Sequence, residues 1–157
     1  MNEKLGMQGK VTVEVIKANG KKDRQIISNA VDSEIKNSIA SGLQGATTYG
    51  LNSSTFSTDN FATPDTGGSG VVVYDGSSYY ETATTSVGAS SGLGHGVKIQ
   101  SSTRASGSNY NLTQAHLGRS KTNGANSDFD IKYASTSFTQ SVNDGQQIDI
   151  TWEVTVS

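Results

Sequence analysis

The sequence predicts a mainly β protein, an antiparallel β-sandwich of the jelly-roll or immunoglobulin-like type with one short helix. Several short segments alternate apolar and polar residues with a period of two, and turn residues separate them. Hydrophobic residues make up only 32% of the chain and glycine occurs 18 times, a composition that disfavours a helix-rich fold. With 157 residues the chain has the length of one domain.

The composition also narrows the range of functions. The chain has no cysteine, which excludes a thiol nucleophile, and only two histidines, His95 and His116, so a zinc site is disfavoured. No apolar stretch is long enough to span a bilayer, and the first residues lack the apolar run of a secretion signal. The net charge of −2 is too small to indicate a nucleic-acid partner. We therefore expect no enzymatic activity, no cofactor or metal, and no nucleic-acid or membrane partner.

The first part of the chain predicts an arm and a hairpin. Residues 1–9 are expected to form an N-terminal arm, and residues 10–157 the single domain. Valines alternate with polar residues in 10–16, a returning strand is expected at 22–28, and Asn19-Gly20 between them favours a tight primed turn. From residue 4 to residue 24 the chain holds six Lys or Arg but only two acidic residues. This basic region could contact an acidic partner surface, although a solvated strand face explains it as well.

The next segment is the one helical pattern. Apolar residues recur every four positions at Val31, Ile35, Ile39 and Leu43, which predicts a short helix over about 31–43. Periodicity then disappears, and we expect a long loop over about 46–70. Loops of this length in compact domains are usually functional, packed by a partner, or disordered.

A second hairpin is predicted after this loop, with strands at 71–74 and 79–85 and the turn at Asp75-Gly76. Its strands carry Tyr74, Tyr79 and Tyr80. These tyrosines could form a sugar-binding ledge or an interface patch, because tyrosine provides contact area at a low entropic cost.

Three more strands are expected at 97–104, 110–117 and 128–138. In the last of them the apolar residues change face, which predicts a bulge or bend near 134–136. Asp128 and Asp130 would lie on one strand face with Cα atoms about 7 Å apart. They could hold calcium or act as the acid and base of a glycosidase, but a solvated face opposite Phe129 is the favoured interpretation.

The final segment, 146–157, alternates without interruption and predicts the clearest strand of the chain. It carries Trp152, the only tryptophan. A large ring among β-branched neighbours is typical of a core anchor, and we favour this interpretation over an exposed stacking platform.

The order of these elements resembles that of a known class of proteins. The opening of the chain predicts a hairpin that leads through an asparagine into a short helix; its segments are 9–15, Asn19-Gly20, 28–31 and 41–43. This opening, together with the closing segments 112–118 and 144–153, resembles a class of small virion proteins of tailed bacteriophages. The chain departs from that class at 115–118, which reads Ala-His-Leu-Gly where the class has Gly-Leu-Phe.

The resemblance implies a non-enzymatic structural protein of the virion. The favoured role is a head decoration or accessory (cement) protein that stabilises the capsid by binding the major capsid protein or other virion proteins, as a homo-oligomer or in many copies in the assembled particle. The alternative is a tail-tube, baseplate or tail-fibre component that could also bind glycans. The candidate partner contacts are Lys4, Leu5, Met7, Lys10, Lys21, Lys22, Arg24, Tyr74, Tyr79 and Tyr80.

Overall fold

The computed structural model describes residues 7–29, 61, 69–89, 96–120 and 129–156. These residues form nine strands, all paired antiparallel, and contain no helix. The predicted mainly β fold is therefore confirmed. The strands are β1 (Met7–Ile16), β2 (Lys22–Asn29), β3 (Ser69–Tyr74), β4 (Tyr79–Glu81), β5 (Thr84–Ala89), β6 (Gly96–Arg104), β7 (Tyr110–Ser120), β8 (Phe129–Val142) and β9 (Gln147–Val156).

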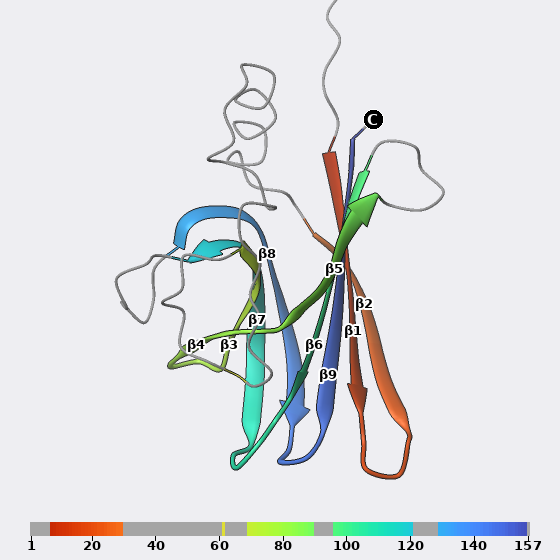
Figure 1. Cartoon of the computed structure of the whole chain (residues 1–157), viewed down its shortest axis with the longest axis vertical. Helices are drawn as coiled ribbons and strands as arrows, with labels where there is room; N and C mark the ends of the chain where they lie inside the picture. Colours follow the sequence, from red (N-terminus) through yellow and green to blue (C-terminus); the bar gives the residue numbers. More distant parts are fainter. Residues whose placement is uncertain (1–6, 30–60, 62–68, 90–95, 121–128, 157) are drawn as a thin grey trace, which may run out of the picture.

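The strands form two sheets in a sandwich-like arrangement (Figure 1). The five-stranded sheet has the order β2-β1-β9-β6-β5, and the four-stranded sheet the order β4-β3-β7-β8. Burial of the apolar face of each sheet against the other is the main stabilising contribution. The core contains Val11, Val13, Val15, Val71, Val73, Ile99, Leu112, Ala115, Leu117, Tyr133, Phe138, Val142, Ile148, Ile150, Trp152 and Val154.

Strand β9 is the centre of the five-stranded sheet. It pairs with β1 on one side and β6 on the other, so the last strand of the chain completes a sheet whose neighbours come from distant parts of the sequence. Its alternation separates buried Ile148, Ile150 and Trp152 from polar residues on the other face. Trp152 is 0% exposed, which confirms that it packs in the core.

The first hairpin forms as expected but differs in two details. Strand β1 begins at Met7, which pairs with Val156, so three residues of the expected arm belong to the sheet. In the turn, the backbone N–H of Gly20 donates to the carbonyl of Lys17 at 2.9 Å, and only Gly20 has a positive φ, of 81°. A primed two-residue turn of the Asn-Gly kind needs positive φ at both residues. The predicted turn therefore forms at Asn19-Gly20 but is not of the primed two-residue type, because the hydrogen bond from the N–H of Lys17 to the carbonyl of Lys21, 2.9 Å, closes a three-residue loop.

The predicted strand 79–85 is in fact two strands in different sheets. Strand β4 ends at Glu81 in the four-stranded sheet, and β5 begins at Thr84 in the five-stranded sheet. Between them, the Thr82 hydroxyl donates to the carbonyl of Val71 at 2.7 Å. The N–H of Ala83 donates to the hydroxyl of Thr103 in the other sheet at 2.9 Å. Because hydrogen bonding passes from one sheet to the other here, alternation alone could not reveal the break.

Strand β8 contains the predicted irregularity. Its pairing with β7 shifts between Leu112 and Gln114 and again between Leu117 and Gly118, which leaves extra residues in β8 on both sides of 134–136. Such bulges change which face a strand presents. Tyr133 and Phe138 are an odd number of residues apart, yet both reach the core.

Several sequence predictions lie outside the described residues. They are the helix at 31–43, His95, Asp128 and most of the loop at 46–70, of which only Phe61 and the start of β3 are described. Only the backbone of Asp130 is described. Over the described ranges, no helix has the length and apolar character needed to cross a membrane.

Candidate functional site

The outer face of the four-stranded sheet is the candidate site. Side chains alternate across a sheet, so residues next to the core positions point away from the other sheet. Strand register places these residues in two rows that run across the four strands. We call this surface the tyrosine face; its rows are Tyr79, Tyr74, Gln114 and Ser137, and Glu81, Val72, His116 and Ser135.

Aromatic rings line the first part of the tyrosine face. The rings of Tyr74 and Tyr79 are stacked, with centroids 4.5 Å apart and an angle of 30° between their planes. The Tyr79 ring also lies 5.6 Å from the ring of His116. Strand β3 separates the strands that carry Tyr79 and His116, so the Tyr79 ring extends across β3 on the side of Val72. Val72 is 0% exposed although it does not belong to the core between the sheets.

His116 is a buried, neutral imidazole. Only 5% of the residue is exposed, and its Nε2 lies 3.1 Å from Oε1 of Gln114. An amide oxygen accepts hydrogen bonds, so Nε2 carries the proton in this contact. Burial, and to a smaller extent the charge of Lys132, lowers the pKa of His116 from 6.5 to about 4. The side chain is therefore uncharged at neutral pH.

A polar cavity of about 430 Å³ adjoins the tyrosine face at His116. It follows β7 and β8 and reaches Ser28 on β2 of the other sheet. Strands β2 and β8 are also joined directly: Nε2 of Gln25 donates to the carbonyl of Thr139 and to Oε1 of Gln140, both at 3.0 Å. The described lining residues are Ser28, Gln114, His116, Lys132, Ser135, Thr136 and Ser137.

The lining of this cavity consists of hydrogen-bonding groups and one positive charge among the described residues. Hydroxyl, amide and imidazole groups can donate and accept hydrogen bonds, and Lys132 adds a positive charge. No carboxylate occurs among the described lining residues. Within the described part of the chain, no group of three or more histidine, cysteine or acidic side chains could hold a metal ion.

Tyr80 does not belong to the tyrosine face. It pairs with Val73, whose side chain is in the core, and its ring packs at 5.1 Å from Tyr110 and 6.0 Å from Phe61. Its hydroxyl donates to Oδ2 of Asp75 at 3.2 Å. The structure thus brings together Tyr74 and Tyr79 but places Tyr80 at the edge of the core.

Asp75 fixes the turn between β3 and β4. Its Oδ1 accepts hydrogen bonds from the backbone N–H groups of Ser77 at 2.9 Å and Ser78 at 2.7 Å. Burial raises the pKa of Asp75, but the hydrogen bonds from Ser78, Ser77 and Tyr80 outweigh that effect and lower it below its usual value. The turn therefore positions Tyr74 and Tyr79 opposite each other on the two strands.

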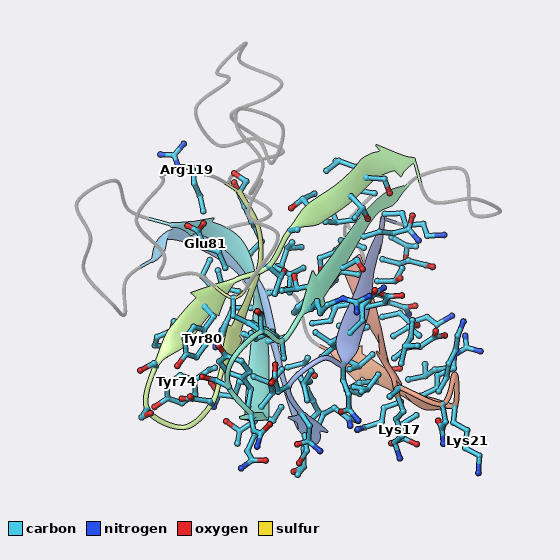
Figure 2. The ribbon with its side chains drawn as sticks, turned by 60° about the horizontal axis from the view of Figure 1, so that its bottom comes forward. Lys17, Lys21, Tyr74, Tyr80, Glu81 and Arg119 are labelled. Atoms are coloured by element: carbon cyan, nitrogen blue, oxygen red, sulfur yellow. The ribbon has the colours of Figure 1, made fainter. Side chains whose placement is uncertain are left out.

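The basic hairpin lies on a different surface from the tyrosine face. Figure 2 shows Lys17 and Lys21 at the turn of the β1–β2 hairpin, on the opposite side of the view from Tyr74. Lys10, Lys22 and Arg24 point away from the core on the five-stranded sheet. Lys4 and Leu5 lie outside the described residues, and only the backbone of Met7 is described.

Carboxylates within the hairpin neutralise part of its charge. The closest approaches are Lys17 Nζ to Asp23 Oδ2 at 3.0 Å, Arg24 Nε to Glu14 Oε1 at 3.4 Å and Lys22 Nζ to Glu14 Oε2 at 3.9 Å. Over the described ranges, Lys10 and Lys21 take part in no ion pair.

Sequence reasoning missed most of the cavity. Gln114, Lys132 and Ser135 come together only through the pairing of β7 with β8, which depends on where the bulges fall. The available signal was that Gln114 and His116 share one side of a predicted strand. Glu81 was also missed, and it is only 1% exposed.

In comparisons with known proteins, no family model, no curated protein and no solved structure matches this chain.

Proposed function

We propose that this chain is a non-enzymatic structural protein of a tailed-bacteriophage virion, and that it decorates the head and reinforces contacts between capsid subunits. The proposal combines the sequence resemblance with a β-sandwich that presents different chemistry on its two outer faces. We further propose that the sandwich is of the jelly-roll or immunoglobulin-like type and that residues 31–43 form its helix.

The observation that carries the proposal is the β1–β2 hairpin. Its described residues hold five Lys or Arg against Glu14 and Asp23, and Lys10 and Lys21 remain outside the ion pairs among them. β1 pairs with the central strand β9 along its whole length, so the strand that carries several of these charges is fixed in the sheet. A charged surface on a rigid element suits association with an acidic neighbour, because charge complementarity guides encounter and orientation.

The mechanism is stabilisation by mass action. A protein that binds the assembled shell but not free capsid subunits lowers the free energy of the shell by its own binding free energy. Many copies add these contributions. The mechanism requires surface for neighbours and needs no chemical step.

The direct test is to locate the protein on purified particles of the virus that encodes it. Gold-labelled antibody against the protein should decorate the heads densely in the electron microscope. Label confined to the tail would overturn the head assignment, and unlabelled intact particles would overturn the virion assignment altogether.

A variant test addresses the hairpin itself. The double variant Lys10→Glu/Lys21→Glu should coat uncoated heads at least ~10-fold more weakly, because it replaces attraction with repulsion at two positions. Lys98→Glu/Arg104→Glu, on β6 of the same sheet, changes the charge by the same amount and is the matched control, which should coat normally. Equal loss in both variants would show that the hairpin is not the contact.

The arm can be tested by a shorter deletion than the sequence alone would suggest. Because Met7 to Gly9 pair with β9, only residues 1–6 can be removed without shortening β1. We expect this truncated protein to remain folded and to lose capsid coating. Coating at unchanged affinity would exclude a role for the arm.

A tail component is the second candidate, and strand β5, at the edge of the five-stranded sheet among the described strands, favours it. Val87 on β5 is 39% exposed, and an edge strand can pair with another copy of the chain. The purified protein would then form rings or trimers in light scattering, and Val87→Lys would return it to monomers. A monomer at all concentrations would leave only the head proposal.

A further inference from the structure

We propose that the cavity beside the tyrosine face binds a saccharide that carries a carboxylate, such as a uronic acid unit. This inference goes beyond the structural role proposed above and does not depend on it. It rests on the cavity lining, on the charge of that lining and on the aromatic rings that hold His116 in place.

The charge of the cavity favours an anion. Lys132 is half-buried, and no carboxylate occurs among the described lining residues to neutralise it. Over the described ranges it takes part in no ion pair. His116 is neutral because burial lowers its pKa to about 4, so Lys132 is the one positive charge among the described lining residues. A single positive charge matches one carboxylate, whereas a phosphate, with its larger charge, is usually held by several cations or by backbone N–H groups.

The remaining lining groups favour a polyhydroxyl compound. Four hydroxyl side chains and the amide of Gln114 line the cavity, and each can both donate and accept hydrogen bonds. Sugar hydroxyl groups have the same dual character. The volume of about 430 Å³ falls in the range of small-molecule sites, roughly 300–1,000 Å³.

The cavity also has one aromatic group in its lining, the ring of His116. Tyr79 packs on this ring with centroids 5.6 Å apart, and Tyr74 stacks on Tyr79 at 4.5 Å. Packed aromatic rings hold one another in place, so the two tyrosines fix the position of the imidazole. A sugar ring has C–H groups as well as hydroxyl groups, and the imidazole is the part of the lining that can contact them.

The rim and floor of the cavity differ in exposure, which allows a ligand to enter. Ser28 and Ser137 are exposed at the rim, whereas His116 and Thr136 are buried at the floor. The Nε2–H of His116 is engaged by Gln114 Oε1, which directs the amide nitrogen of Gln114 away from the imidazole. Gln114 is therefore a donor toward the ligand and also a positioning residue for His116.

The experiment is a calorimetric titration of the full chain with two matched ligands, trigalacturonic acid and its fully methyl-esterified form. The ester keeps the sugar rings and hydroxyl groups but loses the negative charges. We expect the acid to bind at least ~10-fold more tightly, the effect of one charge-assisted hydrogen bond. Lys132→Gln should abolish the preference for the acid over the ester, and Gln114→Ala should weaken the binding of both ligands.

The control is Lys98→Gln, which removes a half-buried lysine from the five-stranded sheet and should leave both affinities unchanged. The inference fails if neither saccharide binds, if the acid and ester bind equally, or if Lys98→Gln has the same effect as Lys132→Gln. It also fails if inorganic phosphate binds the cavity and the saccharides do not.

An NMR titration of the unmodified protein keeps the inference testable if a variant does not fold. The backbone amide signals of His116, Ser135 and Ser137 should shift on addition of trigalacturonic acid. Those of Thr12 and Thr151, on the outer face of the other sheet, should not move. Shifts confined to Thr12 and Thr151 would contradict the inference.

Discussion

The outer faces of the two sheets differ although the same alternation builds both. On the five-stranded sheet, charged groups meet partners at the surface, as Arg24 does with Glu14, and Asp149 accepts a hydrogen bond from the Ser102 hydroxyl at 2.7 Å. On the four-stranded sheet, Val72 and His116 are 0% and 5% exposed on the face that points away from the core. Alternation therefore identifies which residues share a face, but it does not tell whether that face is solvated.

The largest expected effect comes from placing a charge on each outer face. Val72→Asp buries a carboxylate without a counter-ion and should lower the free energy of unfolding by more than about 3 kcal/mol, measured by urea denaturation. Thr12→Asp, at a half-buried position of the five-stranded sheet, should lower the free energy of unfolding by about 1 kcal/mol or less. Similar losses in the two variants would mean that both outer faces are equally solvated.

The second expected effect is a pH dependence that comes from His116 on the four-stranded sheet. The folded-state pKa of His116 is about 4, below its ordinary value of 6.5. Between these values the unfolded chain binds a proton that the folded chain does not, so stability falls as the pH decreases from 6.5 toward 4. The full loss approaches ~3 kcal/mol, and above pH 6.5 it vanishes.

The measurement is the free energy of unfolding of the wild type and of His116→Gln across this window. Acidic residues elsewhere also titrate, but they contribute to both proteins, so the difference between the two curves isolates His116. The titratable and charged groups placed around it on the described strands are Lys132, Tyr79 and Glu81. Parallel curves would show that His116 is protonated to the same extent in the folded and unfolded chains.

The sequence predicted the five-stranded sheet better than the four-stranded one. Val11, Val13 and Val15 alternate with polar residues, as do Ile148, Ile150 and Trp152, and these regular strands lie side by side in the sheet. One face of each is solvated, so the pattern is clean. Both strand assignments and the burial of Trp152 are confirmed.

The four-stranded sheet was harder to predict because part of its outer face is buried as well as its inner face. Val71, Val72 and Val73 are consecutive and all 0% exposed, so no alternation marks which one faces the core. The cavity depends on Lys132 on one side of a bulge and on Ser135 and Ser137 on the other, and bulge positions follow from packing between distant strands. Tyr79 was singled out, but its contact with His116 across β3 required the strand order.

A smaller effect is expected where the two sheets meet. Gln25→Ala removes the hydrogen bonds from β2 to Thr139 and Gln140 on β8, both of 3.0 Å. The loss should be about 1 kcal/mol, measured by thermal or urea unfolding, because exposed neutral hydrogen bonds contribute modestly. Gln147→Ala is the control, because it removes a side-chain hydrogen bond that lies within one sheet and leaves those between the sheets in place. Faster amide exchange in β2 and β8 of the Gln25 variant alone would confirm that this residue joins the sheets; equal exchange in both variants would contradict it.

The smallest effect is expected from Glu14→Gln on the five-stranded sheet. Glu14 lies 3.4 Å from Arg24 and 3.9 Å from Lys22, but these cations are 58% and 59% exposed, so solvent and salt screen the attraction. Asp149 lies directly opposite Glu14 in the sheet, and the substitution also relieves that repulsion. The two contributions oppose each other, so the free energy of unfolding should change by less than about 0.5 kcal/mol at low salt and by even less at high salt. A decrease in the free energy of unfolding several times larger, and insensitive to salt, would mean that these charges are buried as deeply as Val72 and His116. The contrast between the two outer faces would then no longer hold.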